Sequence, residues 1–412
     1  MSNFENYYKN FYYSFLIIVI SNLIYFYTNF INKDINRIIE ILLGLHIFFS
    51  IFFLVHKFHF KNFFMKNNIY LLLLIYCFIQ YIRPPADNYD NIVQNYWLSK
   101  FGGETFDSIF LLPIFYLWSF YKDSIKWFEK LSLLSIKIGI ISIPICYFLN
   151  ISYIYSAFYP IYYLIVGYDY STLKRKIWIT AGLIISTYIF FIEDYRSGIA
   201  RTFLILILLF ILKFKFRKFN KFLLYILILS PILLLITFFN NDNISFQTFL
   251  NYFEFIDPKF TIDTRTFIYI DVVNHFKNTG NLFFGDGGFG NYYSYYMDIW
   301  TNLLGKTSGD NIYRSGSEVG ILNILLKGGI FLMALIIILI LKMANITTKL
   351  FNNNYTYKLS FVVALYFMFM SIENAYIFNF FSVSFWILLS ISSNHNINKL
   401  NDNEISKIFK NI

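Results

Sequence analysis

The stretch Gly316-Ser317-Glu318-Val319-Gly320-Ile321 decides the class of fold, because a long polar segment ends there and an apolar run begins. The run continues to about residue 341, which is long enough for a helix to cross a bilayer. The polar segment before it extends from Asn240 to Glu318. We therefore expect a membrane helix that begins beside one large water-facing loop, where chemistry on a polar substrate has room.

Further apolar runs of this kind recur along the whole chain. They lie at 11–31, 38–56, 67–82, 106–121, 131–149, 151–168, 177–193, 199–212, 222–239, 359–372 and 376–392. With 57% hydrophobic and 14% charged residues, the composition excludes a soluble globular domain. We predict an all-α polytopic membrane protein with about 12 transmembrane helices, in which 1–239 and 319–393 hold the helices and 240–318 forms the large loop.

Lysine and arginine residues set the expected orientation. They fall in alternate connections when the amino terminus is placed inside, as the positive-inside rule requires. The densest inner cluster consists of Lys213, Lys215, Arg217, Lys218 and Lys221. This pattern predicts cytoplasmic termini, an outward-facing loop and a loosely ordered cytoplasmic tail over 394–412. The net charge of +10 is then explained by anionic lipid at the inner leaflet rather than by nucleic acid.

The basic residues expected on the outer side are few, and arginine is prominent among them. These arginines are Arg83, Arg196, Arg201, Arg265 and Arg314. A guanidinium group is planar and always charged, which suits it to bind phosphate through two hydrogen bonds. Arginines at one membrane face therefore predict an anionic, pyrophosphate-bearing substrate.

A short charged turn from Glu193 to Arg201 joins two of the expected helices. Its last arginine lies at the start of the second helix, where a charge close to the apolar region requires a partner, a wet cavity or a route to the surface. One interpretation is that Arg196 and Arg201 bind the substrate. The other is that Arg201 pairs with Glu193 or Asp194 and stabilises the turn.

Two patches in the first part of the large loop are candidates for contacts with the substrate. Asp263-Thr264-Arg265 precedes an amphipathic stretch that predicts a helix over 267–276, with Asp263 or Thr264 as its cap. Phe284-Gly285-Asp286-Gly287-Gly288-Phe289-Gly290 is rich in glycine, so the backbone at Gly287 and Gly288 is free to point N–H groups at a phosphate. A plain turn is the alternative for this second patch.

The third patch runs from Asp310 to Gly320 and ends where the helix begins. If the helix starts one turn early, Arg314 and Glu318 share a face. They then form either an internal salt bridge or a catalytic pair, in which Arg314 binds phosphate and Glu318 orients it, positions a sugar hydroxyl or accepts its proton. We expect no metal and no cofactor, because His56 and His59 lack a third ligand and no zinc-binding cysteine spacing occurs.

Three motifs in this order resemble those of a known superfamily. They are 195–201 at the opening of a helix, 284–290 inside the large loop, and 316–321 followed by Lys327-Gly328-Gly329-Ile330. Together they resemble the O-antigen polymerase and ligase superfamily, and more closely its Wzy-type polysaccharide repeat-unit polymerases. The ligases usually carry a histidine near the position of Asp310-Asn311, and the lack of one here favours a polymerase.

The resemblance implies a GT-C-like membrane glycosyltransferase in a bacterial inner membrane. Such an enzyme joins oligosaccharide units carried on undecaprenyl pyrophosphate at the outer face, and its partners include the bilayer, a chain-length regulator and a flippase. It implies that Arg196, Arg201, Arg265 and Arg314 stabilise the leaving pyrophosphate. The competing interpretations are a ligase-type transferase, a flippase or other transporter of lipid-linked oligosaccharides, and a scaffolding protein.

Overall fold

The computed structural model describes a set of segments between residues 67 and 410. The described residues are 67–83, 112–120, 124–149, 155–193, 195–214, 216–240, 265–288, 290–295, 313–314, 316–373 and 380–410. Four helices are long and apolar enough to cross a membrane, namely α7 (Ser124–Leu149), α9 (Leu173–Ile192), α11 (Arg217–Asn240) and α15 (Gly320–Lys349). The expectation of a helical membrane protein is confirmed at this level. The expected spans at 11–31 and 38–56 lie outside the described residues.

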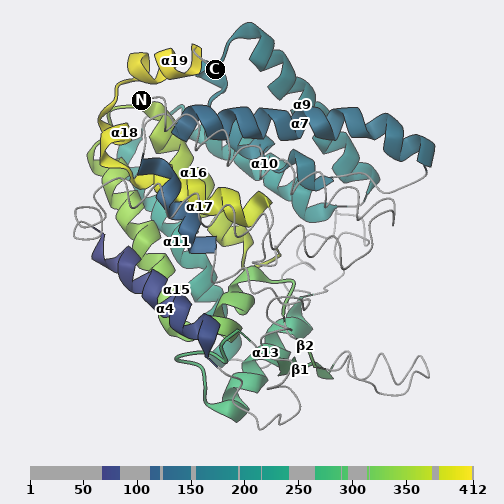
Figure 1. The fold of residues 1–412 in the computed structure, drawn as a ribbon, viewed down its shortest axis with the longest axis vertical. Helices are drawn as coiled ribbons and strands as arrows, with labels where there is room; N and C mark the ends of the chain where they lie inside the picture. Colours follow the sequence, from purple (N-terminus) through teal and green to yellow (C-terminus); the bar gives the residue numbers. More distant parts are fainter. Residues whose placement is uncertain are drawn as a thin grey trace.

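Shorter elements complete the described part of the chain (Figure 1). The longer of these helices are α4 (Asn68–Ile82), α10 (Arg196–Ile211), α13 (Thr266–Thr279), α16 (Asn354–Phe369) and α17 (Phe380–Ser393). The others are η1 (Leu112–Phe120), η2 (Tyr155–Phe158), α8 (Ile161–Leu164), η3 (Tyr168–Tyr170), α18 (His395–Lys399) and α19 (Asp402–Lys410). One antiparallel ribbon pairs β1 (Tyr292–Tyr293) with β2 (Tyr313–Arg314).

The expected span over 151–168 takes a different form. Here the described residues form three short helices, η2, α8 and η3, of which α8 has only four residues. Pro160 has no N–H group to continue the preceding turn, and Gly167 is a weak helix former. All four side chains of α8 are buried in the protein. The apolar run in the sequence therefore reflects burial against other helices.

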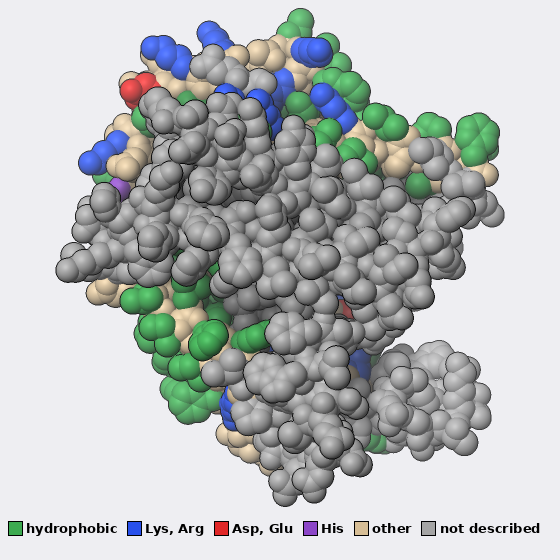
Figure 2. All heavy atoms as spheres, in the orientation of Figure 1, with side chains coloured by type: hydrophobic (Ala, Val, Ile, Leu, Met, Phe, Trp, Pro, Cys, Tyr) green, Lys and Arg blue, Asp and Glu red, His purple; other side chains and the backbone are tan. Residues whose placement is uncertain are grey.

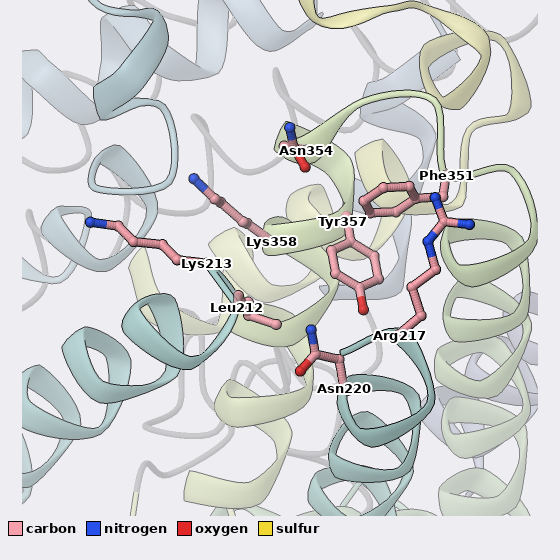
Figure 3. Close-up of a pocket in the computed structure, with 8 residues that line it drawn as sticks. All are labelled: Leu212, Lys213, Arg217, Asn220, Phe351, Asn354, Tyr357 and Lys358. Atoms are coloured by element: carbon pink, nitrogen blue, oxygen red, sulfur yellow. The ribbon is translucent and has the colours of Figure 1, made fainter. Parts of the chain in front are cut away.

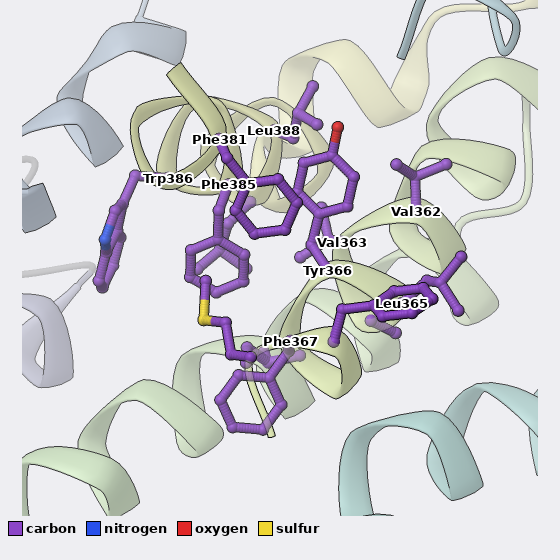
Figure 4. Packing of buried hydrophobic residues seen from close by; sticks show 14 of the residues in the cluster. Val362, Val363, Leu365, Tyr366, Phe367, Phe381, Phe385, Trp386 and Leu388 are labelled. Carbon is purple, nitrogen blue, oxygen red and sulfur yellow. The ribbon is translucent and has the colours of Figure 1, made fainter. Parts of the chain in front are cut away.

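Helices α15, α16 and α17 form the packed centre of the described structure. Within its most apolar stretch, α15 has 72% of its residues buried in protein, whereas α9 and α11 each have 33%. Aromatic rings fill the contact between α16 and α17, where Tyr366 stacks on Phe381 with ring centres 4.3 Å apart (Figure 4). Apolar side chains on the other faces of α9 and α11 are exposed, as is expected of helix surfaces that contact lipid.

Helix α15 is broken one third of the way along. Gly329 has φ 64° and ψ −170°, which is far from helical geometry and favours glycine. The loop at 282–287 bonds to the backbone groups freed by this break. Its hydrogen bonds are Asp286 N to Leu326 O, Gly287 N to Lys327 O, Ile330 N to Leu282 O and Phe331 N to Phe283 O. The loop and the broken helix thus form one unit, as buried backbone groups in a membrane protein require.

The carboxyl-terminal tail is ordered, which corrects the expectation of a loose segment. Helix α19 is amphipathic, and it packs Ile405 and Phe409 into the protein. Tyr170 of η3 donates a 2.5 Å hydrogen bond to Asp402, at the start of α19. The sequence of the tail is rich in asparagine and lysine, but two apolar residues four positions apart are enough to attach one face of a short helix.

Candidate functional site

Helix α10 starts at Arg196 and holds Arg201 inside the protein. The turn before it is compact because Gly198 has no side chain; an added Cβ there would lie 2.3 Å from the ring of Tyr195. Tyr162 and Thr202 both donate hydrogen bonds to the carbonyl oxygen of Gly198. Gly198 therefore lets Tyr195 fold over the first turn of α10, next to Arg201.

The guanidinium of Arg201 lies in an aromatic box and is completely shielded from solvent. The box consists of Tyr159, Tyr195, Phe369 and Phe381, whose ring centres are 5.2 to 5.6 Å from the guanidinium carbon. Arg201 Nη2 donates to Ser197 Oγ at 3.1 Å, but its Nε and Nη1 have no hydrogen-bond acceptor among the described residues. Unbonded donors on a buried cation are costly, so their presence indicates a place for an anionic ligand or water.

Arg201 is the inner end of a row of alternating charges, which we call the ion-pair chain. Its members in order are Arg201, Glu373, Arg265, Glu318 and Arg314. Successive N to O distances along it are 3.9, 3.9, 2.5 and 3.3 Å. The ion-pair chain joins residues more than a hundred positions apart, and it links α10 to the large polar loop.

Three separate elements hold the middle of this chain in place. Arg265 directly precedes α13, and Tyr269 one turn later donates a hydrogen bond to the carbonyl oxygen of Ser371. This bond fixes α13 against the turn after α16, where the N–H of Glu373 donates to Phe369 O at 2.9 Å. Glu373 is thereby held between the guanidinium groups of Arg201 and Arg265, 3.9 Å from each.

The outer end of the chain is fixed by the β ribbon. Arg314 in β2 pairs with Tyr292 in β1, and Ser294 after β1 donates to the buried carboxylate of Asp271 on α13. Burial raises the pKa of Tyr292 to about 12, so this hydroxyl stays neutral near pH 7. The side chain of Arg201 is 1% exposed and that of Glu318 is 53% exposed, so the chain leads from the interior to the surface.

The hydrogen bonds of the glycine-rich turn at 284–290 favour the plain-turn alternative over an anion-binding loop. The N–H groups of Gly287 and Gly288 donate to the carbonyl oxygens of Lys327 and Gln80, so neither points at a ligand. Gly287 has φ +75°, a conformation that glycine adopts readily. In this structure the two glycines therefore serve the packing of the loop on α15.

Lys327, Arg83 and a contact between His275 and Asp286 also stabilise this turn. The buried ammonium of Lys327 donates to the carbonyl oxygens of Gly288 and Gly290, at 2.8 and 2.9 Å. Arg83 donates to Gly285 O at 2.8 Å, and His275 lies 2.6 Å from the carboxylate of Asp286. Arg83 is thus an outer arginine with a structural role, and it lies apart from the ion-pair chain.

The structure brings together four of the predicted site residues, Arg201, Arg265, Arg314 and Glu318. Arg314 and Glu318 do pair, but across a bend before Gly320 rather than on one helix face, because α15 starts only after them. Arg196 is half-buried at the first position of α10, outside the ion-pair chain. Asp263 and Asp310 lie outside the described residues. Helix α13 begins at Thr266, after Arg265.

Glu373 is the member of the chain that the sequence reasoning missed. It is the only Asp, Glu, Lys or Arg between Lys358 and Lys399, in the short link between two apolar runs. An isolated carboxylate at the end of a membrane helix is costly unless it has a partner. The isolation of Glu373 in the sequence could therefore have identified it as a candidate site residue. Comparison of the chain with protein-family models, with curated proteins and with solved structures finds no match. The function is therefore inferred from the residues and their geometry.

Proposed function

We propose that this protein is a membrane glycosyltransferase that polymerises oligosaccharide repeat units carried on undecaprenyl pyrophosphate, as in the synthesis of O-antigen or a related surface polysaccharide. The ion-pair chain is the observation that carries the proposal, since it gathers three guanidinium groups next to apolar helices. A lipid-linked pyrophosphate needs both, because its charge requires arginine and its tail requires a membrane. The proposal includes about 12 spans, a GT-C-like fold and a site on the outer face of a bacterial inner membrane.

The reaction moves the growing glycan from one lipid carrier to the next unit. The bond between the anomeric carbon and the pyrophosphate oxygen breaks, and that carbon forms a bond to a hydroxyl oxygen of the incoming unit. Arg201, Arg265 and Arg314 stabilise the negative charge that develops on the departing pyrophosphate. The electron pair of the broken bond leaves with the pyrophosphate, so the proton of the acceptor hydroxyl is the only proton that needs a base.

Glu318 is the group that we assign to this proton. Of the two carboxylates in the ion-pair chain it is the more exposed, and it accepts hydrogen bonds from Arg265 and Arg314. When pyrophosphate replaces the carboxylate as partner of these arginines, Glu318 becomes available to the hydroxyl. The catalytic residues of the proposal are thus Glu318, Arg314 and Arg265, and Arg201 and Arg196 bind pyrophosphate.

Reconstitution of the purified full-length protein in vesicles with lipid-linked repeat units tests this proposal. We expect a ladder of longer glycans, and we expect Arg265→Ala and Arg314→Ala each to reduce chain extension by about a hundredfold or more, since one lost transition-state contact costs about that much. Lys277→Ala is the matched control, because Lys277 is an exposed cation on α13, the helix that begins directly after Arg265. It should extend chains at the rate of the unmodified protein.

Other products would identify the competing functions. Movement of the units between leaflets without longer glycans would establish a transporter, and transfer of a finished glycan to a different lipid acceptor would establish a ligase-type transferase. Equal activity of Arg265→Ala and the Lys277→Ala control would show that the ion-pair chain has no part in the reaction.

A further inference from the structure

A second group of cations lies at the opposite end of the molecule from the ion-pair chain. It surrounds a cavity of about 300 Å³ between the end of α10, the start of α11 and the start of α16. The side chains of Lys213, Arg217 and Lys358 line it, together with Asn220 and Tyr357 (Figure 3). Helix α11 starts at this cavity and ends near α13, so its 24 residues separate the two places by roughly 36 Å.

The charge of this cavity is unbalanced. No Asp or Glu is among the described residues that line it. Lys213 and Arg217 have no carboxylate partner among the described residues, and the guanidinium of Arg217 lies 4.8 Å from the ring centre of Phe351. Lys358 lies 2.8 Å from the exposed carboxylate of Asp169, which is outside the cavity. Two exposed cations beside a partly open cavity, neither paired with a carboxylate among the described residues, favour an anionic group of the size of a phosphate diester.

The surface beside the cavity is aromatic and apolar. Five exposed phenylalanines flank it at the end of α10 and the start of α11, namely Phe210, Phe214, Phe216, Phe219 and Phe222. Phenylalanines exposed next to lysine and arginine are typical of the boundary between lipid headgroups and acyl chains. Figure 2 shows further Lys and Arg side chains gathered at the end of the molecule that carries α18 and α19. A soluble anion would contact only the cations, whereas a phospholipid would contact the cations through its phosphate and the phenylalanines through its acyl chains.

We propose that this cavity binds the phosphate of an anionic phospholipid headgroup, with the acyl chains of the lipid lying along the exposed phenylalanines of α10 and α11. The lipid would connect α10, α11 and α16 at the membrane surface. Basic pockets between membrane helices commonly bind lipid headgroups in this way. The proposal does not depend on the polymerase function, because the cavity and the ion-pair chain lie at opposite ends of α11.

Native mass spectrometry of the full-length protein, delipidated in detergent and titrated with phosphatidylglycerol, tests the proposal. We expect one tightly retained phosphatidylglycerol and weaker retention of phosphatidylcholine. Lys213→Ala combined with Arg217→Ala should weaken binding about thirtyfold, at about one kcal/mol per lost charge. The control combines Lys218→Ala with Lys221→Ala, which removes the same charge from α11 outside the cavity lining. It should change the affinity by less than about threefold.

Three results would overturn the proposal. Unchanged affinity in the cavity variant would exclude the site, and an equal loss in the control would mean diffuse attraction to a basic surface. Displacement of the lipid by the same concentration of inorganic phosphate would show that the cavity takes a soluble anion instead. If the double variant does not fold, Lys213→Gln at its exposed position gives the same readout, with an expected loss of about fivefold.

Discussion

Arg201 has its full charge in a place without solvent, and the reason lies in the rings around it. Four aromatic faces supply electrostatic attraction, and Glu373 is the only carboxylate for which an ion pair with it is found among the described residues. This carboxylate is shared with Arg265. A buried cation with a shared, distant partner is held less strongly than one in a bidentate pair, so its remaining donors are ready for another anion.

The sharing of Glu373 predicts a coupling that thermal unfolding can measure. Arg201→Gln and Glu373→Gln should each lower stability, but the double variant should lose less than the sum of the two, by about 1 kcal/mol. The reason is that each single change leaves one charge of the pair without its partner. A cycle of Ser197→Ala with Glu373→Gln is the control, since Ser197 contacts Arg201 but carries no charge. Additive losses in the first cycle would mean that the 3.9 Å contact contributes nothing.

The main lesson at the scale of elements concerns the broken helix α15. Its first third packs beside the site, and its remainder forms the centre of the apolar bundle. At the break at Gly329, the backbone of α15 forms hydrogen bonds with the loop at 282–287 of the polar segment. Main-chain hydrogen bonds thus join this loop to a membrane helix.

Gly329 and Gly280 both have positive φ, but only Gly280, with ψ 1°, lies in the left-handed helical region, whereas Gly329 has ψ −170°. Gly329→Ala should destabilise the protein strongly, because its Cβ would lie 2.3 Å from the carbonyl oxygen of Phe283 at φ +64°. Gly280→Ala has φ +71° but meets nothing within 4 Å, so it should cost only about 1 kcal/mol. Melting temperatures in detergent would show the difference. If both variants melt alike, the loop does not pack on the break as described.

The two ends of the whole molecule differ in chemistry. One end carries the ion-pair chain with both signs of charge, and the other carries the basic cavity and the docked helix α19. Apolar helices separate them, and α15 runs from beside Glu318 at the first end to Lys349 at the second. This arrangement suits a protein whose two ends meet different aqueous compartments.

Cysteine labelling in intact cells tests this arrangement. The two native cysteines, Cys77 and Cys146, are buried and should not react with a membrane-impermeant maleimide. Lys277→Cys on α13 should be labelled from outside, whereas Lys218→Cys on α11 should be labelled only after the membrane is opened, because both positions are exposed but lie at opposite ends. Labelling of both from the same side would contradict the proposed topology.

The sequence by itself determined the class of the protein and part of its site. Apolar runs located α4, α9 and α10 to within about four residues and α11 and α16 to within about five, because a helix in lipid must be apolar over most of its length. They also located the start of α15, which ends eight residues later than expected. The same reasoning failed at 151–168, since burial against protein and burial in lipid select the same residues. Charges at the ends of the runs identified Arg201, Arg314 and Glu318, because charges next to the membrane are costly without a role. Arg265 was identified inside the large loop, next to the amphipathic stretch that follows it.

Only the tertiary structure decided which of these charges meet. Arg201 and Arg265 share Glu373, although Arg265 lies 64 positions after Arg201 and Glu373 lies 108 positions after Arg265. No local pattern encodes such a meeting, because it depends on α13 docking against the turn after α16. The structure likewise assigned the glycine-rich turn to the break in α15. Hydrogen bonds between distant segments set both outcomes, and spacing in the sequence does not report them.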